Sequence, residues 1–338
     1  MGREEVLPTI VTDLPAHPAV AAWAAAEGRA DHVVAVTPLK PQHKAGQKSG
    51  VYRLHLENER HDIVAKRCRR KSGVVESLIY QRILPQTGLP VLEFFGSVDD
   101  ADERYMWLFL EDAGQEEAGD ADGILIARWL GRLHASAAGI ARELNLPRRG
   151  AEHYYEHLTS ALNRLAMYEP APHFSPEDRK ILAQVARQCQ VVAQHWPLIV
   201  EFLGQLPETL VHGDFVPKNL RMRGMGSQRH LVALDWETAG IATPAADLAE
   251  LAQQFGVRRE EEVRSYRESS GNLWQGFSLQ TLERAAQFGT LLRLLASVDW
   301  MSYSLAYPWP QKPIRKLQSY EEYLSEIFDQ LGWEGSIQ

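Results

Sequence analysis

The stretch VHGDFVPKNL, residues 211–220, decides the fold of this chain together with LVALDWE at residues 231–237. Two apolar runs typical of strands each lead to an aspartate, Asp214 in the first stretch and Asp235 in the second. Asn219 lies between these two aspartates. A carboxylate can accept the proton of an attacking hydroxyl, and carboxylate and amide oxygens are suitable ligands for Mg²⁺. The pattern therefore predicts phosphoryl transfer, with Asp214 as the catalytic residue and Asn219 and Asp235 as metal ligands.

The spacing H-x-D-x-x-x-x-N with a later aspartate is the catalytic set of the kinase fold. In this chain Gly213 follows the histidine, and DWE at residues 235–237 stands where protein kinases carry D-F-G. This wording resembles the aminoglycoside phosphotransferase and choline kinase superfamily of small-molecule kinases. TPAADLA at residues 243–249 resembles that family's next block, and the resemblance implies that Asp247 braces the catalytic loop. The resemblance covers roughly residues 33 to 255.

The resemblance implies an α+β, two-lobed, protein kinase-like fold, in which a small antiparallel β-sheet with one key helix precedes a mostly helical lobe. Five patterns in the first part of the chain are typical of strands, and they cover residues 33–36, 51–56, 62–66, 88–96 and 105–112. We therefore expect a nucleotide-binding lobe over residues 1–112, a hinge near 110–114, and a catalytic and acceptor-substrate lobe over residues 113–338.

The composition is that of an ordinary globular protein. The chain has 338 residues, 45% of them hydrophobic, and a formal net charge of −8, so neither nucleic acid nor an anionic membrane is an expected partner. Two cysteines, Cys68 and Cys189, are too few for a disulfide framework, which fits a reducing compartment. The sequence shows no signal-peptide pattern and no membrane-spanning run. We expect a cytoplasmic monomer or homodimer that acts on a small molecule.

Two residues of the first lobe are predicted to bind the phosphates of ATP or GTP. Lys66 continues the apolar strand run at residues 63–65, and Glu76 belongs to an amphipathic run over residues 74–84 that Pro85 stops. In kinases a strand lysine contacts the α- and β-phosphates, and a helix glutamate orients it through an ion pair. The alternative is that Lys66 belongs to a solvated basic run, but the strand that it continues favours the first role.

Two further segments are predicted to contact the nucleotide. KPQHKAGQKSG, residues 40–50, has no large apolar side chain, so the backbone around Ser49 and Gly50 is suited to cover a triphosphate. An ordinary exposed hairpin loop is the alternative for this segment. The resemblance further implies that backbone groups from Phe109 to Glu111 hydrogen-bond the adenine edge.

The rest of the chain has helical patterns. The first, over residues 124–140, contains His134, which we interpret as a structural hydrogen-bonding residue without a catalytic role. Residues 151–207 hold two more helices, and Ser175 is predicted to cap the second, because Pro and then acidic residues follow it. Later helical patterns cover residues 247–255, 279–298 and 319–331.

The sequence leaves the acceptor open. Aminoglycoside antibiotics are the first candidate, because such polycations favour carboxylates such as Glu260–Glu262 and Asp299. Solvated helix faces are the alternative for these acids. A choline-like amino alcohol is the second candidate, because the aromatic residues from Trp300 to Trp309 are suited to a cation–π cage. Core packing explains those aromatics equally well, and sugars and other hydroxylated metabolites stay open.

Two other classes of protein are compatible with parts of the pattern. A catalytically silent kinase-like binding module is disfavoured, because such a module is expected to lose at least one of the predicted catalytic and nucleotide residues. A protein kinase is disfavoured as well, because the chain has no H-R-D, D-F-G or A-P-E segment.

Overall fold

A computed structural model describes residues 14–27, 33–39, 50–57, 62–252, 260–307 and 311–333. The chain forms two compact units, one from Met1–Asp120 with Val216–Ala239 and the other from Ala121–Phe215 with Gly240–Gln338. By packing, residues 113–120 and 216–239 thus belong with the first unit, although the sequence predicts them in the second lobe. The functional division at residue 112 into a nucleotide lobe and an acceptor lobe stays a prediction.

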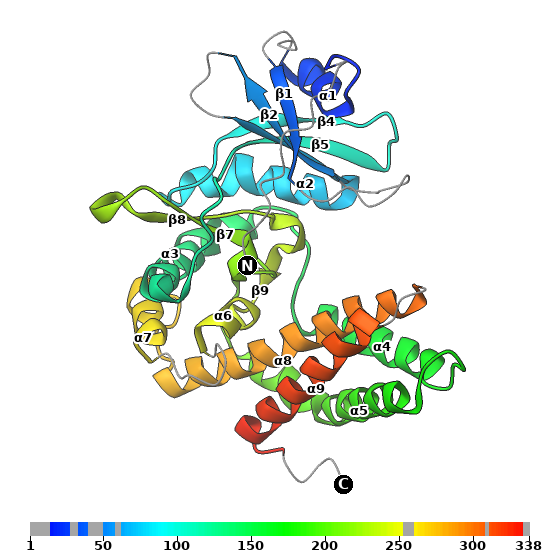
Figure 1. Ribbon diagram of the computed structural model, residues 1–338. Coiled ribbons are helices and arrows are strands. Elements are labelled where there is room, and N and C mark those ends of the chain that lie inside the picture. The colour runs from blue at the N-terminus through cyan, green and yellow to red at the C-terminus, as the bar shows by residue number, and fades with distance from the viewer. Residues whose placement is uncertain are drawn as a thin grey trace. The chain divides into compact units, whose positions relative to one another are not determined.

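The first unit is built on a five-stranded antiparallel sheet, which confirms the predicted α+β class (Figure 1). Its strand order is β1-β2-β3-β5-β4, so β3 is central and β2 and β5 lie on either side of it. The strands are β1 (Val33–Pro38), β2 (Gly50–Leu56), β3 (Ile63–Arg69), β4 (Phe94–Asp99) and β5 (Tyr105–Glu111).

Two predicted strand limits are wrong. The strand expected at residues 88–96 begins only at Phe94, since Pro90 lacks the N–H that a strand interior needs. Strand β3 runs past Lys66 to Arg69, so Lys66 is not the only basic residue in it. Arg67 lies within the strand and pairs with Asp100 through two hydrogen bonds of 2.7 Å, which is why a basic residue is stable there.

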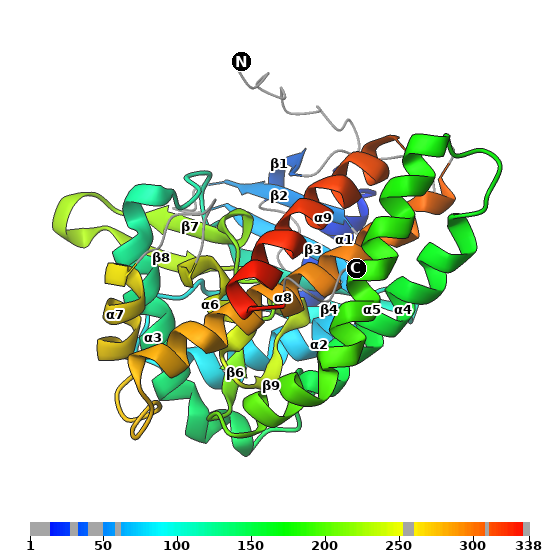
Figure 2. The ribbon, with the colours of Figure 1, turned by 90° about the horizontal axis from the view of Figure 1, so that it is seen from below.

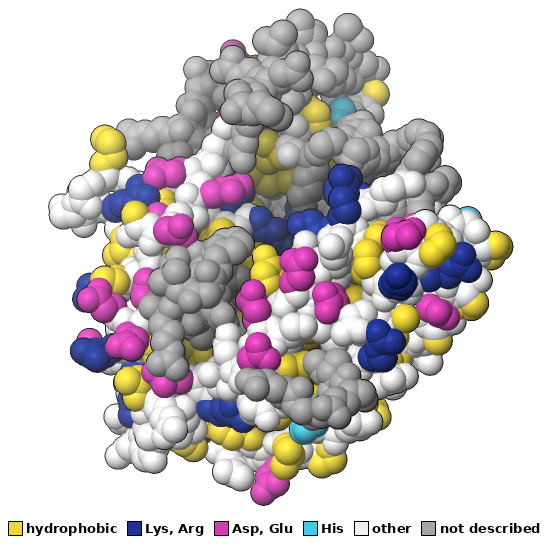
Figure 3. Space-filling view, turned by 60° about the horizontal axis from the view of Figure 1, so that its bottom comes forward, with side chains coloured by type: hydrophobic (Ala, Val, Ile, Leu, Met, Phe, Trp, Pro, Cys, Tyr) yellow, Lys and Arg dark blue, Asp and Glu magenta, His cyan; other side chains and the backbone are white. Residues whose placement is uncertain are grey.

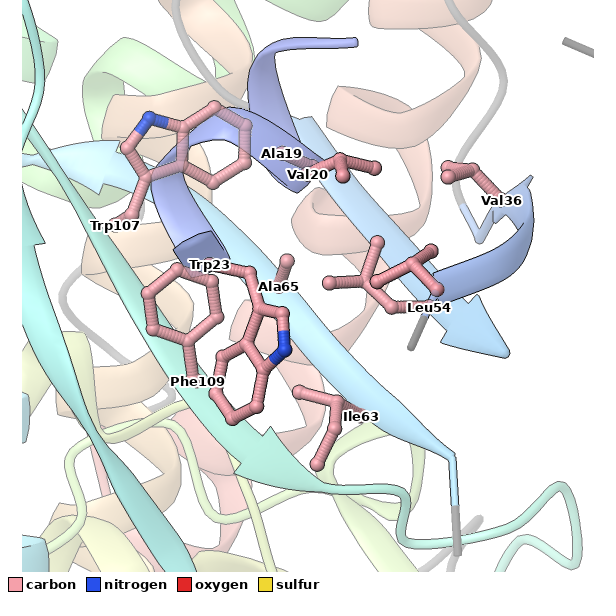
Figure 4. Close-up of a cluster of buried hydrophobic side chains, with 10 residues drawn as sticks. Ala19, Val20, Trp23, Val36, Leu54, Ile63, Ala65, Trp107 and Phe109 are labelled. Carbon is pink, nitrogen blue, oxygen red and sulfur yellow. The ribbon is translucent and has the colours of Figure 1, made fainter. Parts of the chain in front are cut away.

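The two faces of the sheet carry different helices. Helix α1 (Pro18–Glu27) covers one face, where Trp23 lies edge-on to Phe109 at 5.1 Å between ring centroids, beside Ala65 and Ile63 (Figure 4). Side chains of a strand alternate between its faces, so Lys66 and Cys68 point to the other face. Cys68 packs there with Met106 and Leu108.

Helix α2 (Arg70–Leu78) packs on that second face. A Cβ at its Gly73 would lie 2.5 Å from the Met106 sulfur, so the helix backbone sits directly on β5. The helix continues as a π-helical turn at Ile79–Ile83 and a 3₁₀ turn at Leu84–Gln86, and it therefore ends close to the predicted stop at Pro85. Lys66 and Glu76 are consequently on facing elements.

A hairpin of two short strands completes the first unit. Strands β7 (Leu220–Arg223) and β8 (His230–Ala233) pair antiparallel, with Leu220 opposite Ala233. Short 3₁₀ turns flank the pair, at Pro217–Asn219 before β7, at Gly226–Gln228 in the hairpin and at Trp236–Thr238 after β8. The residues before β7 and after β8 therefore meet at one end of the hairpin.

The second unit is mostly helical, as predicted. Helices α4 (Ala151–Tyr168), α5 (Pro176–Gly204), α8 (Leu279–Tyr303) and α9 (Gln311–Leu331) pack side by side, each against two of the others (Figure 2). The predicted cap of α5 is confirmed, because the Asp178 N–H donates to the Ser175 hydroxyl at 3.1 Å. Helix α7 (Glu260–Ser269) packs on α3 (Gly123–Arg142), and a 3₁₀ turn at Ser304–Ala306 follows α8.

Two elements of the second unit position the segment that contains Asp214. Strand β6 (Thr209–Val211) pairs antiparallel with β9 (Gly240–Ala242) and leads directly into His212. Helix α6 (Ala245–Ala252) begins three residues after β9 and packs on α8. The segment that follows β6 is therefore next to the first turn of α6.

The described surface is mixed in charge. On the face shown in Figure 3, Asp and Glu side chains are interspersed with Lys and Arg side chains. Among the helices that the structure describes, none is long and apolar enough to cross a membrane.

Candidate active site

Lys66 is held by two carboxylates of the first unit. Its Nζ donates to Glu76 Oε2 at 2.7 Å and to Asp235 Oδ1 at 2.5 Å. Glu76 is completely buried and the Lys66 side chain is 12% exposed. Strand β3 supplies the lysine, helix α2 supplies Glu76, and the segment after β8 supplies Asp235. The structure therefore brings these three predicted site residues together.

Burial and charge act in opposite directions on this cluster. Burial by itself lowers the pKa of Lys66, but the carboxylates of Glu76, Asp235 and Glu237 outweigh it and raise that pKa well above its usual value. Burial raises the pKa of Glu76, and the nearby Lys66 ammonium offsets only part of this effect. Because Asp235 also contacts Lys66, the ammonium keeps an anionic partner whichever state Glu76 adopts.

Asp235 has an unusual backbone. It is the one non-glycine residue with positive φ in the part of the chain that the structure describes, at φ 68° and ψ 60°. This left-handed conformation costs free energy for a residue with a side chain, and such residues cluster at functional sites. The indole of Trp236, which is fully buried, anchors the turn by donating to the Ala233 carbonyl at 3.3 Å.

The two predicted metal ligands lie at the same end of the β7–β8 hairpin. The Leu234 N–H donates to the Asn219 carbonyl at 3.0 Å, which places Asn219 next to the residue that precedes Asp235. Asn219 is buried, at 4% exposure. One amide and one carboxylate side chain at this position fit Mg²⁺, which typically takes one or two carboxylates and completes its shell with phosphate oxygens and water.

A metal cage formed by protein alone would need more ligands. Among the described residues, no group of three or more His, Cys, Asp or Glu side chains is arranged to hold a metal ion.

The loop that contains Asp214 is held by Asp247 of the second unit. Asp247 Oδ2 accepts the His212 N–H at 2.6 Å, and its Oδ1 accepts the Gly213 N–H at 2.8 Å. Gly213 has φ 77°, so the turn requires a residue without a Cβ. The Asp214 N–H donates to His212 Nδ1 at 3.3 Å. These contacts support the predicted bracing role of Asp247.

His134 lies behind Asp247 and is completely buried. Its Nε2 hydrogen-bonds Asp247 Oδ2 at 3.3 Å, and its Nδ1 hydrogen-bonds the Tyr266 hydroxyl at 2.9 Å. Burial raises the pKa of Asp247, but the hydrogen bond and charge of His134, together with His212, outweigh burial and lower it below its usual value. The contacts of His134 agree with its interpretation as a structural residue.

Arg293 of α8 is the site residue that the sequence analysis misses. Its Nη2 donates to Asp214 Oδ1 and its Nη1 to the Gly213 carbonyl, both at 2.5 Å. A signal exists in the sequence, because Arg293 interrupts the apolar run LLRLL at residues 291–295. A cation in a buried helix face usually requires an anionic partner, but the pattern does not say which one.

The remaining predicted nucleotide residues are in or near the sheet. Ser49 lies outside the described residues, and Gly50 is the first residue of β2, opposite Arg67 of β3. Phe109 is fully buried in strand β5. Glu111 ends this strand; its N–H donates to the Glu93 carbonyl at 2.9 Å, and its carboxylate pairs with Arg223 at 2.6 Å. The contacts of these residues with a nucleotide stay predictions.

The features that suggested a cationic acceptor are partly engaged within the second unit. Asp299 is 5% exposed, hydrogen-bonds His157 at 2.7 Å and pairs with Arg164. The Arg164 guanidinium also lies over the ring of Tyr303, 3.5 Å from its centroid. Asp299 is therefore not on a solvated helix face, while Glu260 and Glu261 are exposed.

Three described aromatic side chains after Asp299 are not buried. Trp300 is 40% exposed, Tyr303 61% and Tyr307 65%, so core packing does not explain these side chains. The Trp300 ring lies edge-on to His157, with 5.8 Å between centroids. Pro308, Trp309 and Pro310 lie outside the described residues, which leaves the proposed cation–π cage untested at its second tryptophan.

A comparison with protein-family models identifies the family of this chain. Residues 41–299 match the model of the phosphotransferase enzyme family, and the chain belongs to this family. The prediction of a phosphotransferase is therefore confirmed. A search of curated proteins finds no match.

Several solved structures similar to this chain are phosphotransferases or kinases. The spectinomycin phosphotransferase APH(9)-Ia in complex with ADP and spectinomycin has a TM-score of 0.59 at 13% identity, covering 92% of this chain and 98% of its own. The GDP complex of wild-type aminoglycoside 2'-phosphotransferase-IIIa has a TM-score of 0.60 at 13% identity, covering 90% and 97%. A microcompartment-associated aminopropanol kinase has a TM-score of 0.60 at 15% identity, covering 90% and 95%. These likenesses confirm the predicted kinase-like fold.

Proposed function

We propose that this chain is a Mg²⁺-dependent kinase that transfers the γ-phosphate of ATP or GTP to a hydroxyl of a small molecule. The observation that carries this proposal is the contact of Lys66 with both Glu76 and Asp235, in a chain of the phosphotransferase family. Kinases require a strand lysine paired with a helix glutamate and an aspartate after a later strand that holds Mg²⁺, and Lys66, Glu76 and Asp235 have these positions. Similar structures with bound ADP and GDP support the nucleotide.

Lys66 binds the nucleotide phosphates in this proposal. Its ammonium stays charged because the surrounding carboxylates raise its pKa despite burial. Glu76 orients Lys66 through the 2.7 Å hydrogen bond, and Ser49 and Gly50 cover the phosphates with backbone N–H groups. Backbone groups near Phe109 and Glu111 hydrogen-bond the base.

Asn219 and Asp235 would hold Mg²⁺ in this proposal. The cation supplies charge neutralisation at the β- and γ-phosphate oxygens. Lys66 Nζ donates to one oxygen of Asp235, so the same carboxylate that would hold the cation also positions the lysine that would bind the phosphates.

Asp214 orients the acceptor hydroxyl and accepts its proton. The acceptor oxygen forms a bond to the γ-phosphorus, and the bond between this phosphorus and the β–γ bridging oxygen breaks. The nucleoside diphosphate leaves, and the proton passes from the acceptor to Asp214 and then to solvent. Most of the rate enhancement is expected from orientation, because phosphoryl transfer requires little covalent chemistry from the protein.

Aminoglycosides are the first acceptor candidate, and amino alcohols are the second. The similar structures support both, because they include a spectinomycin phosphotransferase, an aminoglycoside 2'-phosphotransferase and an aminopropanol kinase. Glu260 and Glu261 remain exposed carboxylates for a polycation, whereas Asp299 is engaged by Arg164. Trp300 is exposed enough to contact an amino alcohol. We place the reaction in the cytoplasm, and turnover of an aminoglycoside would make antibiotic resistance its role.

The test is nucleotide consumption by the purified protein against a panel of acceptors. The panel contains aminoglycosides, choline, ethanolamine, aminopropanol, amino acids and sugars, each with ATP and with GTP, and with Mg²⁺ or EDTA. Asp214→Ala is the blank. Consumption that requires an acceptor, Mg²⁺ and Asp214 supports the proposal. Nucleotide binding by the wild type without turnover of any acceptor would favour a silent binding module.

A further inference from the structure

We propose that Arg293 is a positioning residue for the transfer, because it holds the Asp214 carboxylate and the preceding peptide in one orientation. This inference rests on the proposed role of Asp214. Nη1 and Nη2 of one guanidinium donate to the Gly213 carbonyl and to Asp214 Oδ1, both at 2.5 Å. The planar guanidinium has a fixed geometry, so two simultaneous bonds restrict the rotation of the Asp214 side chain relative to its own backbone.

The contact is protected from solvent. The side chain of Arg293 is 14% exposed and that of Asp214 is 12% exposed. Burial lowers the pKa of Arg293, but the Asp214 carboxylate outweighs burial and raises it, so the guanidinium is charged at any working pH. A buried ion pair is screened by salt far less than a surface pair.

Gly213 is held on both sides by the second unit. Its N–H donates to Asp247 of α6, and its carbonyl accepts from Arg293 of α8. A glycine in the left-handed region is conformationally permissive, so a single contact would leave the following residue free to reorient. Contacts from two helices fix both peptide planes next to Gly213.

A close approach of α6 and α8 sets the reach of Arg293. A Cβ at Gly289 of α8 would lie 1.7 Å from the Ala245 carbonyl oxygen, so only glycine allows the observed spacing at the start of α6. Gly289 and Arg293 are four residues apart and therefore share one face of α8. The helix spacing that brings Asp247 to one side of the loop thus brings Arg293 to the other side.

The charged and titratable groups around the pair come from three elements. Asp247 lies on α6, His212 precedes the loop, and Tyr154 lies on α4. Burial raises the pKa of Tyr154 to about 12, although Arg293 and Arg149 lower it, so Tyr154 is neutral at working pH. The positive charge of Arg293 thus interacts favourably with the carboxylates of Asp214 and Asp247.

The first test does not require an acceptor. The carboxyl carbon of Asp214 is followed by ¹³C NMR as pH falls, with Asp214→Asn used for assignment. In Arg293→Met the carboxyl group is expected to titrate about one pH unit or more above the wild type, since an adjacent guanidinium favours the ionised form. Arg293→Lys keeps the charge and is expected to titrate near the wild type. Equal titration of wild type and Arg293→Met would overturn the proposal.

The matched control is Arg284→Met on the same helix. Arg284 also donates to backbone carbonyls, those of Gln330 and Leu331, but it contacts neither Gly213 nor Asp214. The titration of Asp214 is expected to be unchanged in this variant. A shift as large as in Arg293→Met would assign the effect to general loosening of α8 and would also overturn the proposal.

The second test uses an acceptor that the panel identifies. We expect kcat to fall about 100-fold in Arg293→Met and about 10-fold in Arg293→Lys, with KM for the nucleotide unchanged, because misplacement of a catalytic group costs rate more than binding. A higher kcat in Arg293→Met would make Arg293 an inhibitory latch and would contradict the proposal. If no acceptor is turned over by the wild type, the proposed function fails, while the carboxyl titration still decides whether Arg293 holds Asp214. If Arg293→Met does not fold, Arg293→Lys is compared with Arg284→Lys by the same kinetic measurement.

Discussion

Each unit contains one charged cluster of the proposed site, and the two clusters are built differently. In the first, one cation, Lys66, lies among the carboxylates of Glu76, Asp235 and Glu237. In the second, the carboxylate of Asp214, the proposed catalytic residue, is held by one cation, Arg293, and the loop before it is held by Asp247. The first cluster has three carboxylates around one cation, whereas the second has two carboxylates, those of Asp214 and Asp247, around one.

In the proposed function, nucleotide and Mg²⁺ complete the first cluster, whereas contacts within its own unit already order the second. If the proposed function holds, the carboxylates around Lys66 disfavour a bare triphosphate and favour one that brings Mg²⁺. The left-handed backbone of Asp235 costs free energy, as backbone conformations at functional sites often do. The Asp214 segment is fixed within its own unit, because it donates to the Asp247 carboxylate and accepts from Arg293, so these contacts orient it without a metal. Variants of the two clusters should therefore fail in different ways.

The largest effect is expected from Asp214→Asn. Transfer to the acceptor should fall about 1000-fold, because the variant keeps the shape of the side chain but loses the proton acceptor. The Kd for Mg²⁺–nucleotide, measured by calorimetry, should stay within about twofold, because the nucleotide cluster is intact. A tenfold change in that Kd would show that the two clusters do not act separately.

Asp235→Asn should break the first cluster in a metal-dependent manner. With Mg²⁺, nucleotide affinity should fall about 100-fold or more, because loss of an outer partner alone costs a metal site about 10–100-fold and Asp235 is a proposed ligand itself. With EDTA, nucleotide affinity should rise, because one negative charge next to the phosphates has been removed. Glu76→Gln is the matched comparison and should lower affinity about 10-fold with Mg²⁺. Equal effects of Asp235→Asn with and without Mg²⁺ would argue against a metal-ligand role.

Gly289→Ala should destabilise the second unit. The added Cβ meets the Ala245 carbonyl, and overpacking of this kind costs about 1–3 kcal/mol of unfolding free energy. The control is Gly139→Ala in the interior of α3, where a Cβ meets nothing within 4 Å. That variant should gain about 0.5–1 kcal/mol from helix propensity. Urea unfolding measures both, and equal stability of the two variants would contradict the close approach of α6 and α8.

A smaller effect, on the pH dependence of stability, is expected from His153 of α4. Burial, Arg149 and His157 lower its pKa from 6.5 to about 4, so the imidazole should be neutral at pH 5.5. Because the folded pKa lies below the unfolded value, its contribution to stability is present above pH 6.5 and is lost as pH falls toward 4. Imidazole NMR gives the pKa, and His153→Gln should weaken the pH dependence of unfolding in this range. A measured pKa near 6.5 would contradict the burial of this side chain.

The sequence predicts well those features that depend on short spacing. The segment with Asp214, the block with Asp247 and the cap of α5 are each a short pattern of neighbouring residues, so local sequence is sufficient to find each of them. The alternation along β3 likewise predicts which side Lys66 faces, and the helix after it carries Glu76. The start of β4 is predicted too early, because the apolar residues before Phe94 resemble a strand although Pro90 lies among them.

Features that depend on helix packing could not be predicted in the same way. Arg293 follows Asp214 by 79 residues, and their contact depends on the spacing of α6 and α8 at Gly289. Nothing local indicates which carboxylate an arginine within an apolar helix will meet. The partners of Asp299 are a second case, because Arg164 and His157 come from α4. Asp299, which the sequence suggests as a contact for a cationic acceptor, is a buried ion-pair partner in this fold.

The most direct test of the central claim is the fate of the γ-phosphate. Wild-type protein is incubated with Mg²⁺, nucleotide and each acceptor that stimulates consumption, and the products are followed by ³¹P NMR. The account predicts a phosphomonoester on the acceptor that forms at the same rate as the nucleoside diphosphate and is lost in Asp214→Asn. Inorganic phosphate as the only product, with the acceptor unmodified, would contradict transfer to a hydroxyl and would make the chain a nucleotide hydrolase.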